Sequence, residues 1–419
     1  MLGSGLHPDR IPAMKLPPLT PEQQVKPQRF ELRISLLFAA LFVPMGVHLP
    51  YFPLWLEAKG FDPEQIAIIL SAPMFLRVIT TPLIAAMADR ARDRANVFIF
   101  LAASALLLSL GYFLEPAYLI VLAVSLALAV VWTPHSPIAD SLALSGVRRY
   151  GSDYAAMRIW GSIAFLAGSL GAGFILSWTG ADAVPVIISI GLLGCFLMSF
   201  ITPRLGRPRQ ASPLSAADMQ QAPKLFNRYF LLMAGGTGVI IGSHGFLYGF
   251  VSIYWKSLGI DETIVGLLWS WGVAAEIVMF MFFTRLFGSR STALVLVLAG
   301  AGAIVRWIAY PLIWPLGLGV PGFFAVQSLH ALSTALVLIG VQKLIAESIP
   351  EERTGAAQGA AYFTNGMSMA IVTLVSGPLY ERFGVNGFFF MAGVAACAIV
   401  LVVLASRSAP ERGQGRRHH

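Results

Sequence analysis

Twelve apolar segments of membrane-spanning length follow one another along this chain, and they leave few folds open. A helix needs roughly 20 apolar residues to cross a hydrocarbon core about 30 Å thick. Inside that core every backbone polar group must be satisfied within the segment, so such segments fold as helices. The sequence therefore predicts an all-α polytopic membrane protein. The expected spans are residues 32–56, 63–88, 96–114, 117–146, 154–178, 183–202, 228–256, 263–286, 291–312, 316–343, 355–379 and 384–405.

The composition excludes most other classes of protein. The chain is 57% hydrophobic and 12% charged, whereas about a quarter of the residues of a soluble domain are charged. Its two cysteines, Cys195 and Cys397, fall inside apolar runs, so we expect neither a disulfide framework nor a metal site. Phosphate-binding, esterase and metalloprotease motifs are absent from the sequence. We therefore expect a protein that is not an enzyme and needs no cofactor.

The longest polar break divides the spans into six and six. It runs from Pro203 to Asn227 and predicts a cytoplasmic central loop, residues 203–227, between two six-helix bundles, residues 31–202 and 228–405. The Pro-rich residues 1–30 predict a disordered tail, and residues 406–419 form a second tail. Two halves of this kind are typical of transporters whose site lies at the membrane midplane.

The basic residues indicate the orientation. We call the membrane side that carries the N terminus side A and the opposite side B. Outside the spans, only Lys59, Lys256 and Arg382 fall on side B. Because basic loops stay in the cytoplasm, both termini are expected there, in a multi-pass protein of the cell (inner or plasma) membrane. Topology thus accounts for the net charge of +8, and no nucleic-acid partner is expected. The expected partners are the lipid bilayer, a small-molecule substrate and protons, and the chain is expected to be a monomer.

Two opposite charges, Asp140 and Arg158, lie within neighbouring spans. Asp140 and Arg158 are equally far along the chain from Arg149, which lies between the spans. A helical hairpin turning there would put both roughly 13 Å deep, at about 1.5 Å per residue. A charge at that depth costs at least about 2.5–3.5 kcal/mol unless it is paired or faces water. We therefore expect a functional role for both.

Other ionisable residues also lie deep within expected spans. Any one of them is explained by a structural ion pair or a helix–helix hydrogen bond, but together they imply an aqueous cavity. Three arginines against two acids leave one cation without a fixed partner. A substrate carboxylate would supply the missing anion, because guanidinium binds carboxylate in a bidentate fork. The further residues are Arg77, Arg306, Glu276, His48, His135, His244 and His330.

Aromatic residues gather near these charges. Trp55, Tyr254 and Trp255 close their spans on side B and fit an interfacial belt. Others lie further in, and an aromatic wall with a cationic end would suit an aromatic acid. These deeper residues are Trp160, Tyr248, Trp269, Trp271 and Trp307.

Several motifs resemble the major facilitator superfamily. Asp89 and Arg90 stand where that superfamily has its gating loop, although Ala85 and Arg92 replace expected glycines. Within the superfamily the chain most resembles the phenylpropionate permease family, over residues 30–405. The resemblance implies two helical bundles that work by alternating access. It rests on Pro137-Ile-Ala-Asp140, Asp153-Tyr154-x-x-x-Arg158-Ile-Trp160-Gly161-Ser162, Gly249-Phe250-Val-Ser-Ile-Tyr254-Trp255, Trp269-Ser-Trp-Gly-Val-Ala-Ala-Glu276, Val305-Arg306-Trp307 and Gln327-Ser-Leu-His330.

That family is similar in turn to the lactose permeases, and this similarity implies roles for five residues. Asp140 and Arg158 stand where lactose permeases bind sugar. Glu276, Arg306 and His330 stand where they combine sugar binding with proton coupling.

Three other positions depart from the lactose permeases. His48 replaces a tyrosine, Gln327 replaces a lysine, and Ser333 replaces the carboxylate that carries the proton. Because a serine does not titrate, another group must carry any coupled proton.

The sequence thus predicts proton-coupled uptake of a small organic acid, such as a phenylpropionate-like aromatic carboxylate. Arg158 is expected to anchor the anion, with Asp140 and Glu276 as its partners when the site is empty. Glu276 is the leading proton carrier, since burial raises the pKa of a carboxyl group and a nearby arginine lowers it. Proton coupling is assigned to Glu276, His330 and Asp140, and substrate binding to His48, Arg77, Asp140, Arg158, Trp160, Tyr248, Trp271, Arg306 and Gln327.

Two alternatives remain open at this point. One is a sugar or nucleoside proton symporter, or an exporter of drugs or metabolites, of the same fold. The other is a receptor that senses a ligand without transporting it, which the absence of a soluble signalling domain disfavours.

Overall fold

The expected helical architecture is confirmed. A computed structural model of the protein describes residues 21–206, 227–349 and 354–408, and within them the regular structure is entirely helical. In this described part, 11 helices are long and apolar enough to cross a membrane. The last of them, residues 356–407, contains α16 (Thr354–Phe383) and α17 (Gly387–Arg407), which the turn Gly384–Asn386 separates. Most of the expected central loop and the ends of both tails lie outside the described residues.

We call the helices before residue 207 the N-terminal group. Aspartate side chains cap three of them by accepting backbone N–H groups, and Asp62 forms a full capping box with Gln65. Gly151, with φ at +68°, ends one helix and lets the chain turn directly into the next. The group comprises α2 (Phe30–Ala58), α3 (Pro63–Arg90), α4 (Arg94–Ser109), α5 (Tyr118–Trp132), α6 (His135–Tyr150), α7 (Tyr154–Thr179) and α8 (Val184–Ser199).

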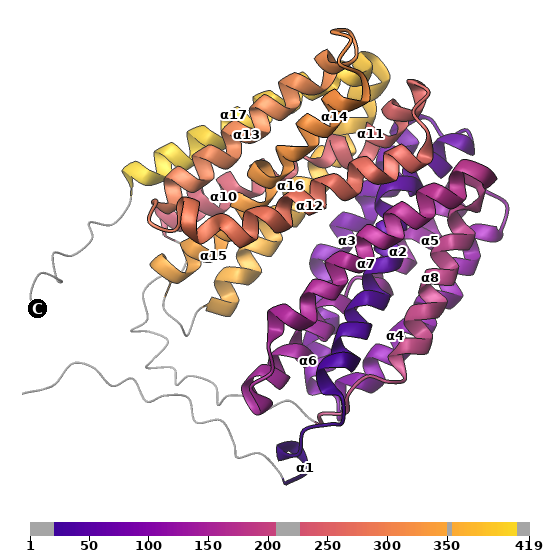
Figure 1. The fold of residues 1–419 in the computed structure, drawn as a ribbon, viewed down its shortest axis with the longest axis vertical. Coiled ribbons are helices and arrows are strands. Elements are labelled where there is room, and N and C mark those ends of the chain that lie inside the picture. Colours follow the sequence, from indigo (N-terminus) through magenta and orange to yellow (C-terminus); the bar gives the residue numbers. More distant parts are fainter. Residues whose placement is uncertain (1–20, 207–226, 350–353, 409–419) are drawn as a thin grey trace, which may run out of the picture.

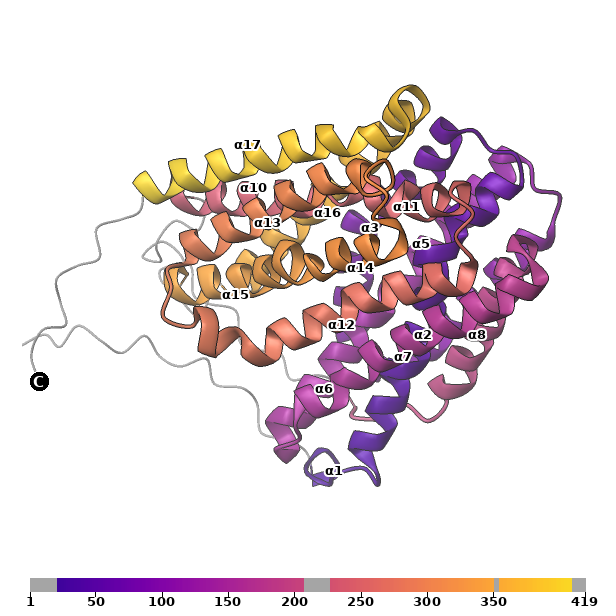
Figure 2. The same ribbon diagram turned by 45° about the horizontal axis from the view of Figure 1, so that its top comes forward.

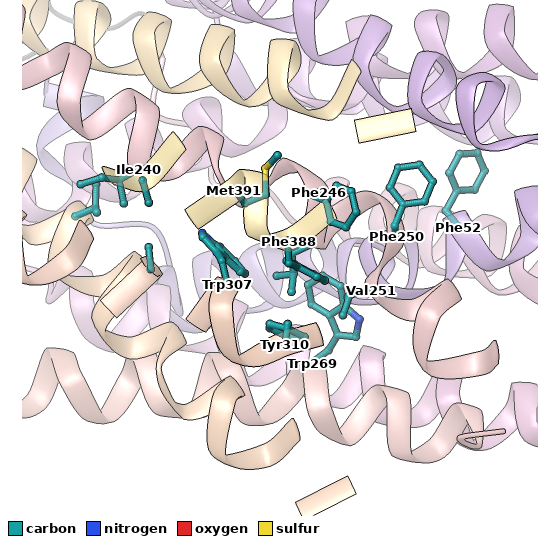
Figure 3. Close-up of a cluster of buried hydrophobic side chains, with 14 of the residues drawn as sticks. Phe52, Ile240, Phe246, Phe250, Val251, Trp269, Trp307, Tyr310, Phe388 and Met391 are labelled. Atoms are coloured by element: carbon teal, nitrogen blue, oxygen red, sulfur yellow. The ribbon is translucent and has the colours of Figure 1, made fainter. Parts of the chain in front are cut away.

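The helices after residue 226 form the C-terminal group. They comprise α10 (Arg228–Gly242), α11 (Gly245–Ser257), α12 (Glu262–Phe287), α13 (Thr292–Ile313), α14 (Gly319–Ser328), α15 (Leu336–Ser348), α16 and α17. Figure 3 shows part of the core of this group, where the ring of Phe388 stacks on Tyr310 at 4.5 Å and on Trp307 at 5.5 Å. These rings bury large apolar areas and fix the faces that α13 and α17 present to each other.

Three expected spans are broken within their length, which the apolar pattern did not predict. Thr133 and Pro134 separate α5 from α6, and Ser243 and His244 separate α10 from α11. A π-helical segment, Ala331–Ala335, lies between α14 and α15. Proline removes a backbone donor, and π segments occur often at functional sites.

The expected disorder of the first 30 residues does not extend to residues 21–30. A short helix, α1 (Pro21–Gln24), precedes α2. The hydroxyl of Tyr150 donates to the backbone oxygen of Gln23 at 3.2 Å, and Lys26 pairs with Glu31 at 2.5 Å. These polar contacts tie this part of the tail to the ends of α6 and α2.

Each group packs mainly on itself, and a few helices join the two groups. Contacts between the groups run along α3 with α16, α7 with α12 and α2 with α11. Figures 1 and 2 both show α7 and α12 side by side.

The joint between α7 and α12 is tightest near side B. The hydroxyl of Tyr51 donates to the backbone oxygen of Ser169 at 2.8 Å and lies 3.2 Å from that of Glu262, the first residue of α12. A Cβ on Gly266 would lie 2.6 Å from the oxygen of Ser169, so only glycine permits this approach. All buried residues of α12 fall between Val265 and Gly272. The side A half of α12 has no fully buried residue, and in Figure 1 the two groups diverge toward α6 and α15.

Candidate functional site

A cavity of about 730 Å³ lies between the two groups, mostly in the N-terminal one. Residues of α2, α3, α5 and α6 make up most of its wall, and α11 and α16 close it from the other group. Four of the predicted substrate-binding residues line it: His48, Arg77, Asp140 and Tyr248. The other predicted substrate-binding residues lie outside its wall in this conformation.

Arg77 is the cation that lines this cavity without a fixed partner. It lies on α3 between Pro73 and Pro82, and it makes no hydrogen bond or ion pair with any described residue. Its electrostatic neighbours are His48 and Tyr362, neither of which is an acid. Since a guanidinium deep in a membrane protein must face water or an anion, the geometry leaves Arg77 available to a ligand.

Asp140 and Arg158 are linked through a third residue. The hydroxyl of Tyr154 donates to Oδ1 of Asp140 at 2.9 Å and also hydrogen-bonds to the side chain of Arg158. The Arg158 guanidinium stacks over Phe42, 4.3 Å from the ring centre, and Asp140 but not Arg158 lines the cavity. Among the described residues, Arg158 forms no ion pair within 4.0 Å with either of its expected partners. Tyr154 was not predicted, although its position one turn before Arg158 was the available signal.

Arg306 is buried in the C-terminal group, with 0% of its surface exposed. It donates to Nδ1 of His330 at 2.8 Å, to Oγ of Ser333 at 3.3 Å and to Oε1 of Gln327. Gln327 also accepts from the hydroxyl of Tyr310 at 2.8 Å and donates to the backbone oxygen of Leu268 at 2.9 Å. Two residues that were expected to bind substrate, Arg306 and Gln327, are thus bound to each other.

Glu276 lies beside His330, with 3.1 Å between Oε1 and Nε2. Arginine can only donate, so the Arg306 contact requires an unprotonated Nδ1 on His330. The imidazole proton is then on Nε2 and faces Glu276. The hydroxyl of Thr334 lies between the two histidines, 3.2 Å from Nδ1 of His330 and 3.3 Å from Nε2 of His244. A carboxylate and an imidazole thus lie side by side here, although position 333 carries no carboxylate.

Trp160 and Trp271 lie away from the cavity. Their exposed fractions are 50% and 48%, and the indole of Trp271 donates to Ser328 at 2.8 Å. In an apolar multi-pass protein such half-exposed positions suit contact with lipid or with neighbouring helices.

The predicted gating loop lies at the side A end of α3. Asp89 is 3.9 Å from the guanidinium of Arg94, which is only 2% exposed and donates to Ser141 and Ser145 of α6. Arg94 was not predicted as a site residue. Its sequence signal was its place at the start of a span, one residue after a capping aspartate.

Comparison with known proteins identifies the family. The profile described as the MFS_1 like family matches residues 31–391. The chain is 27% identical to a probable 3-phenylpropionic acid transporter of Escherichia coli (strain K12), over 88% of this chain and 96% of that protein. It is 25% identical to a maltose permease of Geobacillus stearothermophilus, over 90% of this chain and 92% of that one.

Solved structures share the fold. The crystal structure of the nucleoside transporter NupG superposes with a TM-score of 0.70 at 16% identity, over 91% of this chain and 99% of that one. At that identity the likeness shows the fold alone. The expected superfamily is confirmed by the profile match and by the two transporter relatives. The chain is a multi-pass membrane transporter of the major facilitator type and belongs to the MFS_1 like family.

Proposed function

We propose that this protein is a secondary active transporter that takes up a small organic acid together with protons. Twelve membrane crossings in two six-helix bundles would move it by alternating access around the central cavity. The observation that carries the proposal is Arg77, a guanidinium in the cavity wall that has no partner among the described residues. A substrate carboxylate would pair with this guanidinium through two parallel, charge-assisted hydrogen bonds. Arg77 replaces Arg158 as the proposed primary anchor, because Phe42 and Tyr154 already engage Arg158.

An aromatic carboxylate fits the rest of the wall best. Most of the wall is apolar, and its aromatic side chains offer rings against which a planar body can stack. The E. coli relative is named for 3-phenylpropionic acid, which makes that compound the first to test. The aromatic members of the wall are Phe42, Phe52, Tyr112, Trp132, Tyr248 and Tyr362.

The proposed proton site is the pair Glu276 and His330. The carboxylate of Glu276 and the imidazole of His330 lie 3.1 Å apart in a part of the C-terminal group that does not line the cavity. Asp140 is the second candidate, because it lines the cavity and faces the substrate directly. Coupling through either group would let a carboxylate and a proton cross the membrane together.

The conformation fits one state of an alternating-access cycle. The two groups are joined near side B through Tyr51 and Gly266, whereas the side A half of α12 contains no fully buried residue. With the basic side A in the cytoplasm, this is an inward-facing state.

Uptake into proteoliposomes tests the function. We expect accumulation of 3-phenylpropionate only when an inward-directed proton gradient is imposed, and no accumulation of maltose or uridine in the same vesicles. Preference for a neutral sugar or nucleoside would contradict the organic-acid proposal. Binding of a carboxylate without accumulation under any gradient would instead favour a ligand sensor.

A further inference from the structure

The cavity offers a second unsatisfied charge besides Arg77. Asp140 lines the same wall, and only its Oδ1 is engaged, by the hydroxyl of Tyr154 at 2.9 Å. Its Oδ2 makes no hydrogen bond with any described residue. Neither Asp140 nor Arg77 forms an ion pair within 4.0 Å with any described residue, so they are not paired with each other. Asp140 is half-buried, so water or a ligand in the cavity can supply the donor that this oxygen lacks.

The two charges lie on different helices that line the same cavity. Arg77 is near the middle of α3, and Asp140 is in the first half of α6, beyond the break at Pro134. Aromatic side chains of α2, α5 and α16, among them Phe52, Trp132 and Tyr362, also line this cavity. The cavity wall therefore offers a hydrogen-bond donor at Arg77, an apolar aromatic surface, and a hydrogen-bond acceptor at Asp140.

We propose that the preferred substrate carries a carboxylate at one end and a hydroxyl group at the other, with an aromatic body between them. This inference rests on the proposed function and adds to it. Arg77 binds the carboxylate, the aromatic wall packs against the ring, and the free oxygen of Asp140 accepts the hydroxyl hydrogen. A hydroxylated phenylpropionate has this chemistry.

The charge balance favours a neutral donor over an ammonium group. Asp140 is already linked to the positive Arg158 through Tyr154, whereas no charge of opposite sign is paired with Arg77. Arg77, Arg158 and Asp140 together carry one net positive charge, which a monoanion neutralises and a zwitterion leaves uncompensated. The donor end should therefore be a hydroxyl.

Matched ligands test this on the wild-type protein. The affinities of 3-(4-hydroxyphenyl)propionate, 3-(4-methoxyphenyl)propionate and 3-phenylpropionate are measured in detergent by ligand-induced thermal stabilisation. The methoxy compound keeps the oxygen but cannot donate. A hydrogen bond to a charged acceptor predicts that the hydroxy compound binds at least about tenfold more tightly than the methoxy compound. Equal affinities for these two would overturn the inference.

A variant assigns the selectivity to Asp140. In Asp140→Asn the carbonyl oxygen can still accept from Tyr154, but the free position becomes an amide NH₂ that cannot accept. The ratio of the affinities for the hydroxy and methoxy compounds should fall to about twofold or less. This holds even if the substitution also changes the overall affinity. A ratio that stays at the wild-type value would overturn the assignment to Asp140. Tyr154→Phe is the control variant. It removes the hydroxyl that donates to Asp140, but it leaves both carboxylate oxygens of Asp140 free to accept.

Two further results separate the possible failures. If 3-(4-aminomethyl-phenyl)propionate, a zwitterion, binds more tightly than the hydroxy compound, the choice of a neutral donor is wrong. If all three carboxylates stabilise the protein equally, the inference fails and the organic-acid function stands. If none of them stabilises it, the proposed function fails as well.

Discussion

The hydroxyl of Tyr154 lies 2.9 Å from Oδ1 of Asp140 and joins this carboxylate to Arg158 on the next helix. Gly151 ends α6 with φ at +68° and starts the short turn that brings α7 back beside it. The two opposite charges therefore share a hydroxyl instead of a direct ion pair. This arrangement leaves one oxygen of Asp140 free toward the cavity.

Replacing Tyr154 by phenylalanine should lower the stability of the fold. The change removes a hydrogen bond to a charged group, worth about 1.5–3 kcal/mol, and we expect a lower Tm in detergent. Tyr118→Phe is the matched control, because the hydroxyl of Tyr118 makes no hydrogen bond with any described residue. Identical melting of the two variants would show that the Tyr154 hydroxyl contributes nothing to stability.

Substitution of Arg77 should affect binding much more than stability. Arg77→Gln removes the proposed carboxylate partner and should weaken 3-phenylpropionate binding by about 10- to 100-fold, the worth of a charge-assisted hydrogen bond. Arg77→Lys keeps the charge and loses the bidentate fork, so it should be intermediate. Competition binding in detergent measures both, and wild-type affinity in Arg77→Gln would exclude Arg77 as the anchor.

Substitution of Arg306, in contrast, should strongly affect the stability of the fold. Arg306→Leu removes three buried hydrogen bonds, to Gln327, His330 and Ser333, and a hydrogen bond from a charged group contributes about 1.5–3 kcal/mol. We therefore expect a loss of about 3 kcal/mol or more, seen as a much lower Tm. Arg77→Leu makes the same chemical change at an arginine without partners and is the control. Equal losses in both variants would mean that the Arg306 network does not stabilise the fold.

The membrane-spanning pattern was the part of this fold that the sequence predicted best. Apolar length and polar breaks depend only on local composition, and they located the spans. The interruptions at Pro134 and His244 were not predicted, because apolar composition continues through them. Pro134, Pro137 and Gly245 were the available signals.

The site was predicted less completely, because pairing depends on the rotation of each helix about its own axis. Depth along the spans placed Asp140 near Arg158, but it did not reveal Tyr154 between them. Charge counting required one arginine without a fixed partner, and it did not identify Arg77 as that residue. Arg306 was expected in the cavity, whereas its partner Gln327 holds it within the C-terminal group.

Proton coupling should depend on Glu276. Glu276→Gln removes the carboxylate that faces Nε2 of His330, so a proton gradient should no longer drive accumulation of 3-phenylpropionate in proteoliposomes. Exchange of labelled for unlabelled substrate at equal pH should continue, because it needs no net proton movement. Glu115→Gln, at an exposed carboxylate between α4 and α5, should keep both activities. Gradient-driven accumulation by Glu276→Gln would transfer the proton role to Asp140 or His330.

The side B joint should be sensitive to a single methyl group. A Cβ on Gly173 would lie 2.5 Å from the backbone oxygen of Glu262 and still closer to the hydroxyl of Tyr51. Gly173→Ala must therefore separate α7 from α12 at side B, since the contacting atom is backbone. We expect a longer distance between spin labels at Thr179 and Ser257, which are exposed near the side B ends of α7 and α11.

Gly171→Ala provides the control for this change. Gly171 lies on the same helix, and a Cβ there meets nothing within 4 Å, so its label distance should match that of the unsubstituted labelled protein. Because the two variants add the same methyl group to the same helix, a difference between them isolates the contact with Glu262. Opening at side B should also slow transport, since the cycle must close this side once in each turnover. Unchanged label distances in Gly173→Ala would show that α12 shifts only locally, and that this contact does not control whether side B is open or closed.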